Sequence, residues 1–475
     1  MDRLPLPPNN TRLGFHYFPD TLHFRDSDLG VWLPELKALN ASWLTLLAPV
    51  DRAIPESFIK GVTSAGIEPI LHFHLHLDKP ASQQELKAMF TAYASWGVHY
   101  IALFDRPNTR AAWRASSWAQ SNLVERFLDL YLPLAETVLQ SGLLPVFPPL
   151  EPGGDYWDTA FLRAALQGIQ RRGQNQIIDR LILGAYAWAG AHYLNWGAGG
   201  PERWPAARPY YTPPDSEDQR GFRIFDWYQT IAQTVTREPC HILLLGAGCS
   251  LGEAAENKDN VINEKAHACR NMALAALMMN MDFDSTSIIT DDPNDDGSLE
   301  AVPPQVLCCN YWLLSANSDS PHASQAWYQP DGKTLPIVGA LRDWLSRQKN
   351  SVNGKEMPQP KAFTSVVAEN VSAEQSAANI HPFRANCAIN HYLLLPHYEW
   401  GVADWHLDVI RPFVKKYQPT VGFSTAEATH AWRVTVVGGP QSFPESILDE
   451  LRAAGCMVEQ ISGDGTSIAS QLAIL

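Results

Sequence analysis

Residues Ile101-Ala102-Leu103-Phe104-Asp105-Arg106-Pro107-Asn108 form a short apolar run that ends in charged and polar side chains. The run Ile242-Leu243-Leu244-Leu245-Gly246-Ala247-Gly248 is equally apolar and ends in small residues. Uninterrupted apolar runs are typical of parallel strands that are buried on both faces. We therefore expect each run to be a central strand, with its carboxyl end where a parallel α/β fold places its functional groups.

Six further apolar runs alternate with amphipathic helical stretches between residues 12 and 345. Eight strands are predicted in all, at residues 13–18, 43–48, 68–75, 100–104, 144–147, 181–186, 241–245 and within 306–315. Eight such units in series predict a TIM (β/α)8 barrel rather than an open doubly wound sheet, because no glycine-rich phosphate loop follows the first strand. The loops after the fourth to seventh strands are long and aromatic, which indicates that they carry the function.

Two domains are expected in this chain of 475 residues. Residues 1–345 are assigned to the barrel, and the polar, non-periodic residues 346–362 to a linker. Residues 363–475 contain three strand-like apolar runs with helical stretches between them, which predict a small α/β domain.

The composition is that of an ordinary globular protein, with 45% hydrophobic and 18% charged residues. The net charge of −14 argues against nucleic acid or an anionic membrane surface as the partner. No apolar run is long enough for a membrane span or a secretory signal, so a cytoplasmic location is expected, with export by another route left open. The seven cysteines show no disulfide framework.

The end of the fourth predicted strand, Phe104-Asp105-Arg106-Pro107-Asn108, resembles the Asn-Glu-Pro-Asn signature of the large (β/α)8 glycoside hydrolase clan. Leu245-Gly246-Ala247-Gly248 is similar to the Thr-Glu-Gly motif of that clan, and Tyr311-Trp312-Leu313-Leu314 is similar to its eighth strand. The resemblance implies a sugar-cleaving barrel with its acid/base at Asp105 or Arg106 and its nucleophile at Ala247. The two usual catalytic glutamates are therefore replaced here. Arginine stays protonated and alanine has no carboxyl group, so neither residue can take over the catalytic work.

Other carboxylates are candidates for the catalytic work, namely Asp105, Glu151 and Glu253, since each lies near a loop on the expected functional face. Asp105 would be the acid and Glu151 or Glu253 its partner, provided that the two carboxyl groups lay about 5 to 9.5 Å apart. In the alternative interpretation, Asp105 pairs with an arginine and the glutamates are solvated.

The expected ligand is a carbohydrate or a related polyol. Aromatic side chains can stack on sugar faces, while a few polar groups fix the hydroxyls. The candidate substrate-binding residues are His16, His76, Asn108, Trp113, Tyr156, Trp188, His192, Tyr193 and Trp327.

Three histidines alternate in Leu71-His72-Phe73-His74-Leu75-His76, so we expect them on one face of the third strand, inside the barrel. A His-x-His strand begins the metal site of amidohydrolase-type barrels, but the fifth and sixth strands offer no further ligands. Hydrogen-bonded interior histidines are the favoured interpretation, and neither a metal nor a cofactor is predicted.

The acidic turn at 292–297 departs from a calcium loop, because Pro303 stands where the bidentate glutamate is needed.

Near the carboxyl end, Arg433-Val434-Thr435-Val436-Val437-Gly438-Gly439 followed by residues 450–463 resembles one unit of a cell wall binding repeat of type 2. That family normally works as three copies on secreted proteins, so one copy implies the small α/β fold more than it implies wall binding. A packing or oligomerisation domain is the alternative.

Three hypotheses for the function stand side by side. The first is a glycosidase-like barrel that binds carbohydrate without the usual catalytic pair. The second is an active glycoside hydrolase with displaced carboxylates. The third is a non-catalytic scaffold within a larger assembly.

Overall fold

The computed structural model divides into two compact units, Met1–Gln359 and Pro360–Leu475, which are described separately. The residues that it describes are 4–79, 82–190, 192–252, 262–281, 299–352, 389–396, 410–411, 413–414, 417, 419–439, 442–462, 468 and 471–472. Among these residues, no helix is both long and apolar enough to cross a membrane.

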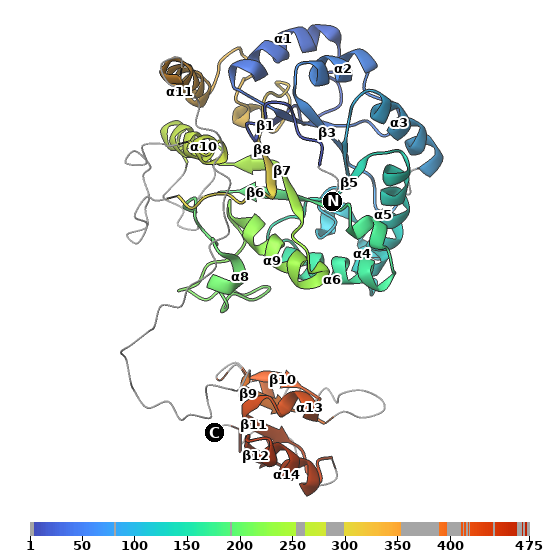
Figure 1. Cartoon of the computed structure of the whole chain (residues 1–475), viewed down its shortest axis with the longest axis vertical. Coiled ribbons are helices and arrows are strands. Elements are labelled where there is room, and N and C mark those ends of the chain that lie inside the picture. Colours follow the sequence, from blue (N-terminus) through green and yellow to red (C-terminus); the bar gives the residue numbers. More distant parts are fainter. Residues whose placement is uncertain are drawn as a thin grey trace. The chain divides into compact units, whose positions relative to one another are not determined.

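The first unit is a closed barrel of eight parallel strands in sequential order (Figure 1). The strands are β1 (Leu13–His16), β2 (Trp43–Leu47), β3 (Glu68–Phe73), β4 (Tyr100–Leu103), β5 (Leu144–Phe147), β6 (Ile182–Trp188), β7 (His241–Gly248) and β8 (Val306–Tyr311). The barrel closes where β1 pairs with β8, with Gly14 opposite Asn310. The predicted TIM barrel is confirmed.

Helices surround the strands (Figure 1). The longer ones are α1 (Asp26–Ala38), α2 (Glu56–Ser64), α3 (Gln83–Ser95), α5 (Leu123–Gln140), α6 (Asp158–Arg171), α9 (Ile224–Thr236), α10 (Glu264–Met278) and α11 (Pro336–Val352). Short helices α4 (Ala115–Trp118), α7 (Asn175–Ile178) and α8 (Gly200–Arg203) lie in the connecting segments. Helix α11 continues through residues 346–352, which were expected in the linker, and residues 353–362 lie outside the described part.

Side chains alternate along the strands and so form two separate cores. The inner core fills the barrel and includes Trp43, Tyr100 and Leu243. The outer core, between the strands and the helices, includes Phe15, Phe73 and Ala247. This alternation decides which residues at the strand ends point into the barrel mouth, the opening at the carboxyl ends of the strands where functional groups of this fold lie.

The second unit is a parallel sheet of four strands in the order β10-β9-β11-β12. The strands are β9 (Ile389–Leu394), β10 (Thr420–Gly422), β11 (Ala431–Val437) and β12 (Met457–Ile461), with helices α13 (Thr425–Ala428) and α14 (Glu445–Ala453). Alternate residues of β9 belong to two different apolar clusters, so both faces of the sheet are covered. The small α/β fold is confirmed, although β10 was not predicted, because it is three residues long and two of them are exposed.

Candidate functional site

Asp105 and Arg106 follow β4 and form an ion pair at the barrel mouth. Arg106 Nε donates to Asp105 Oδ2 at 3.0 Å, and Arg106 Nη1 donates to Glu151 Oε2 at 3.3 Å. The other Asp105 oxygen, Oδ1, accepts from the Tyr186 hydroxyl at 2.7 Å. We call Asp105, Arg106 and Glu151 the ion-pair network. The arginine partner that the alternative interpretation gave to Asp105 is therefore present.

The chain around Asp105 has an unusual backbone conformation. Phe104 and Arg106 have φ angles of 67° and 44°, in the left-handed region that side chains with a Cβ seldom adopt. Hydrogen bonds hold both residues: the Phe104 N–H donates to Phe73 O at 2.8 Å, and the Arg106 N–H donates to Pro149 O at 3.0 Å. Such conformations cost about 1–3 kcal/mol each, so these contacts are needed to hold Asp105 and Arg106 in place at the end of β4.

Asn108 fixes the loop after β5 and does not face the mouth. Its Nδ2 donates to Glu151 O at 2.9 Å and to Tyr156 O at 3.0 Å, and its Oδ1 accepts from the Glu151 N–H at 2.8 Å. The side chain is fully buried. Asn108 was expected to touch substrate, but its amide group instead hydrogen-bonds to the backbone of Glu151 and so holds that residue in position.

Asp105 is held as a carboxylate. Burial raises the pKa of Asp105, but His74, His72, Arg106 and the Tyr186 hydroxyl lower it more, so the pKa lies below its ordinary value. Both of its oxygens accept hydrogen bonds from donors. Asp105 is therefore suited to accept hydrogen bonds from a ligand and poorly suited to protonate a leaving group near neutral pH.

Two tryptophans and a tyrosine form what we call the aromatic platform. Tyr186 and Trp188 both point toward the mouth from β6, and their rings stack at 5.2 Å with an interplanar angle of 18°. Trp312, just after β8, meets Trp188 edge-on at 6.0 Å and 83°. Tyr186 is buried, whereas Trp188 and Trp312 are half-buried. Partly exposed aromatic faces of this kind can stack on the apolar face of a sugar ring.

The platform adjoins the ion-pair network. The guanidinium carbon of Arg106 lies 5.4 Å from the centre of the Tyr186 ring, within the range of a cation–π contact. The mouth thus offers flat apolar rings beside carboxylate oxygens and guanidinium donors. This combination matches the two kinds of surface that a carbohydrate presents.

Strand β7 brings no carboxylate to the mouth. Ala247, the position that the resemblance assigned to the nucleophile, belongs to the outer core and not to the mouth. The register of β6 and β7 shifts at Ala185 and Tyr186, so Gly246 lies opposite Tyr186. A Cβ atom on Gly246 would lie 2.5 Å from the Trp188 ring. The space beside β7 is therefore filled by the aromatic platform.

The loop after β6 adds a second group of aromatic residues. His192 stacks on Trp196 with ring centres 4.1 Å apart, and the Tyr193 hydroxyl donates to Glu217. His192 and Tyr193 are both half-buried. Tyr156, in the loop after β5, is also half-buried and packs edge-on against Phe161 at 5.5 Å.

Besides Asn108, three of the expected site residues lie away from the mouth, and one is not described. Trp113 is buried and donates to Pro107 O at 2.8 Å, while Trp327 is fully buried against Phe15 and Tyr311. His76 lines a small cavity with residues of α3 and α5. The expectation of three histidines on one strand face fails because β3 ends at Phe73 and a tight turn follows, in which the Leu75 N–H donates to Phe73 O. Glu253 lies outside the described residues.

Three residues of the mouth were not among the candidate site residues: Tyr186, His74 and Trp312. The sequence does contain a signal for Tyr186, because side chains two apart on a strand share a face and Trp188 is a candidate site residue. His16, a candidate substrate-binding residue, is buried at the end of β1, and its ring lies edge-on to Trp312 at 4.7 Å.

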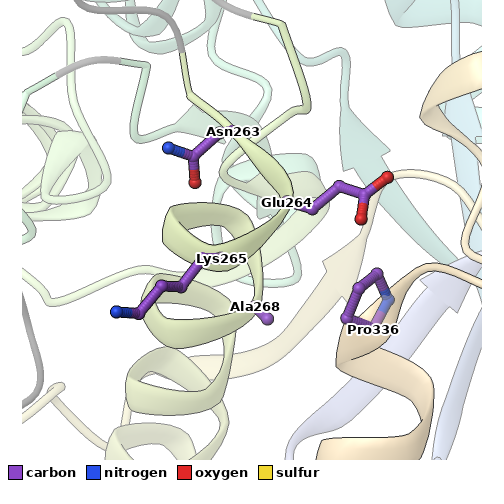
Figure 2. Close-up of a pocket in the computed structure, with 5 residues that line it drawn as sticks. All are labelled: Asn263, Glu264, Lys265, Ala268 and Pro336. Carbon is purple, nitrogen blue, oxygen red and sulfur yellow. The ribbon is translucent and has the colours of Figure 1, made fainter.

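A separate hollow lies between the amino ends of α10 and α11 (Figure 2). Figure 2 shows Glu264 pointing toward Pro336, while Asn263 and Lys265 point to the other side of α10. Asn263 also caps its own helix, since its side chain accepts from the Ala266 N–H. These groups do not converge, so the hollow has no chemistry of its own.

Comparison with models of protein families finds no match, and comparison with curated proteins finds none either. Among solved structures, a family 39 glycoside hydrolase from the gut symbiont Bacteroides cellulosilyticus WH2 has a TM-score of 0.45 at 10% identity, covering 72% of this chain and 65% of that chain, slightly less than two thirds. A GH39 β-xylosidase from Caulobacter crescentus has a TM-score of 0.42 at 10% identity, covering 73% of each chain. A GH10 protein from Paenibacillus barcinonensis has 0.40 at 11%, covering 72% of this chain and 98% of that one. At these values the similarity extends no further than the barrel architecture.

Proposed function

We propose that this protein binds carbohydrate at the barrel mouth and does not hydrolyse it by the two-carboxylate mechanism. The observation that carries the proposal is the aromatic platform, which lies directly beside the ion-pair network. Stacking on Trp188 and Trp312 would hold a sugar ring, and Asp105, Arg106 and Glu151 would hydrogen-bond to its hydroxyls.

The arrangement argues against the hydrolase alternative that pairs Asp105 with Glu151. A glycosidase needs one protonated carboxyl group and one free carboxylate. Here one guanidinium donates to both groups, and Asp105 receives a second donor from Tyr186. Neither retaining nor inverting chemistry is supported by a pair of carboxyl groups that accept hydrogen bonds from the same arginine.

The proposal is tested by calorimetric titration of the intact chain with a panel of neutral oligosaccharides. Trp188→Ala should weaken binding at least about tenfold, since loss of a stacking face is worth roughly 1.4 kcal/mol. Trp344→Ala is the matched control, because Trp344 is equally half-buried but lies on α11. Equal affinity of wild type and Trp188→Ala, or no binding by the wild type, would refute a sugar site on the platform.

A further inference from the structure

Three side chains of the types that can bind a metal ion, two imidazoles and one carboxylate, meet at the barrel mouth. His72 is the penultimate residue of β3, His74 follows that strand, and Asp105 follows β4. One ligand atom from each lies within 4.8 Å of the other two. The sequence interpretation looked for further ligands on the fifth and sixth strands, whereas the fold supplies the third ligand from the neighbouring fourth strand.

The spacing of the two histidines fits a small divalent ion. His74 Nε2 and His72 Nδ1 are 3.3 Å apart. These two atoms share a hydrogen bond, and their separation equals the ~3.3 Å between two ligands of a tetrahedral zinc ion at about 2.0–2.1 Å, so an ion could take the place of the shared hydrogen. A carboxylate oxygen of Asp105 lies within 4.8 Å of both nitrogen atoms and would move slightly closer to join them. The rings meet edge to face at 76°, which directs the two nitrogen atoms toward each other instead of stacking the ring faces.

The other nitrogen of His72 is already fixed in the way that metal-binding histidines usually are. His72 Nε2 lies 2.8 Å from Phe104 O, and a carbonyl oxygen can only accept. Nε2 therefore carries the hydrogen, which leaves the lone pair of a neutral ring on Nδ1, facing His74. A backbone carbonyl that orients the ring in this way is a common outer-shell partner of a metal ligand.

The charge around the three residues also suits a cation. Asp105 supplies the negative charge, while Arg106 and Tyr186 orient its carboxylate. The positive charge of Arg106 is shared with Glu151. His16 lies at the end of β1 with its ring edge-on to Trp312 at 4.7 Å; it is 2% exposed, and no described residue hydrogen-bonds to its Nδ1.

We infer that His72, His74 and Asp105 bind one divalent transition-metal ion of the zinc class at the barrel mouth. Two imidazoles and one carboxylate form a three-residue ligand set, which leaves at least one position open toward the mouth. The inference goes beyond carbohydrate binding and does not depend on it, because the metal is tested in the absence of any sugar.

The test uses the intact chain, prepared without a histidine tag and freed of metal, titrated with Zn²⁺ alone and separately with Co²⁺ alone. Wild type should bind one ion per chain and give the strong visible absorption of tetrahedral Co²⁺. His74→Ala and Asp105→Asn should each weaken Zn²⁺ binding at least about tenfold. His76→Ala is the matched control, since it lies two residues from His74 but lines the cavity beside α3 and α5.

Folding of each variant is checked by circular dichroism. Both variants are expected to fold, because His74 is exposed and Asp105→Asn keeps the shape of the side chain. Wild type that binds no Zn²⁺ would overturn the inference. The inference would also be overturned if His74→Ala and Asp105→Asn both folded and bound Zn²⁺ with the affinity of wild type. That result would indicate an adventitious ion only.

Discussion

Arg106 and Gly246 decide what the barrel mouth can do. Arg106 joins two carboxylates that a hydrolase would have to keep in different protonation states. Gly246 gives the Trp188 ring a place beside β7, where a side chain would displace it. In the proposed function, Arg106 keeps Asp105 and Glu151 from acting as an acid, and Gly246 leaves room for the ring that would stack on a sugar.

Gly246→Ala should disturb the aromatic platform, because the new Cβ would lie 2.5 Å from the Trp188 ring and 3.1 Å from the Tyr186 ring. We expect oligosaccharide affinity to fall about tenfold or more, with a change in tryptophan fluorescence. Gly339→Ala on α11 is the control, since no atom lies within 4 Å of its new Cβ and alanine favours a helix. Unchanged affinity of Gly246→Ala would show that Trp188 does not form the binding surface.

At the scale of elements, the long loops are held by buried polar contacts. Asp158, the first residue of α6, accepts from the Gly153 N–H at 3.0 Å and from Gln219 Nε2 at 2.7 Å. Its second oxygen accepts from the Tyr228 hydroxyl of α9 at 3.0 Å. This one carboxyl group therefore ties the loop after β5 to the segment that leads into α9.

Asp158 should make stability depend on pH. Burial raises its pKa from 3.8 to about 6, so the folded chain retains a proton that the unfolded chain loses between about pH 4 and pH 6. Protonated Asp158 contributes about 3 kcal/mol to the free energy of unfolding. This contribution is fully present below about pH 4 and is lost as the pH rises to about 6 and above. Denaturant unfolding should show the stability of wild type relative to Asp158→Asn falling by this amount between pH 4 and pH 7. A stability difference between wild type and Asp158→Asn that does not change with pH would contradict the buried-acid account.

The sequence predicted the strands and most of the long helices, because apolar runs and helical periodicity are local properties. The sequence did not predict where the side chains point beyond the ends of the strands. Side-chain alternation fails after Phe73, which turns His76 away, and the register shift beside β7 determines that Gly246 and not Ala247 meets the platform. The burial of Trp327 and the loop contacts of Asn108 depend on residues far apart in the sequence, which no local pattern reveals.

At the scale of the whole molecule, each unit has its own apolar core. The barrel unit contains all eight strands and α11, and the carboxyl-terminal unit contains a sheet with a cluster on each face. The residues of the ion-pair network and of the aromatic platform all belong to the first unit. The proposed carbohydrate site therefore lies among described residues of one unit, which has an apolar core of its own.

A chain ending at Val352 should therefore fold and bind oligosaccharide with an affinity within about twofold of the full chain. A chain ending at Leu335 is the informative control, because it lacks α11, whose Ile337, Val338 and Leu341 are buried in the outer core. Loss of those side chains should cost several kcal/mol and prevent stable folding, at roughly 1.5–3 kcal/mol for each. Thermal unfolding measures whether each truncated chain folds, and calorimetry measures its affinity for oligosaccharide. Failure of the chain ending at Val352 to bind would contradict a self-contained site.

The central claim is that the mouth holds carbohydrate without cleaving it, and the most direct measurement is the analysis of an oligosaccharide recovered from its complex with the protein. After long incubation of the intact chain with a bound oligosaccharide, chromatography should return that sugar at its original length. Shortened products that appear with wild type and are absent with Asp105→Asn would contradict the account, because they would show that Asp105 catalyses hydrolysis.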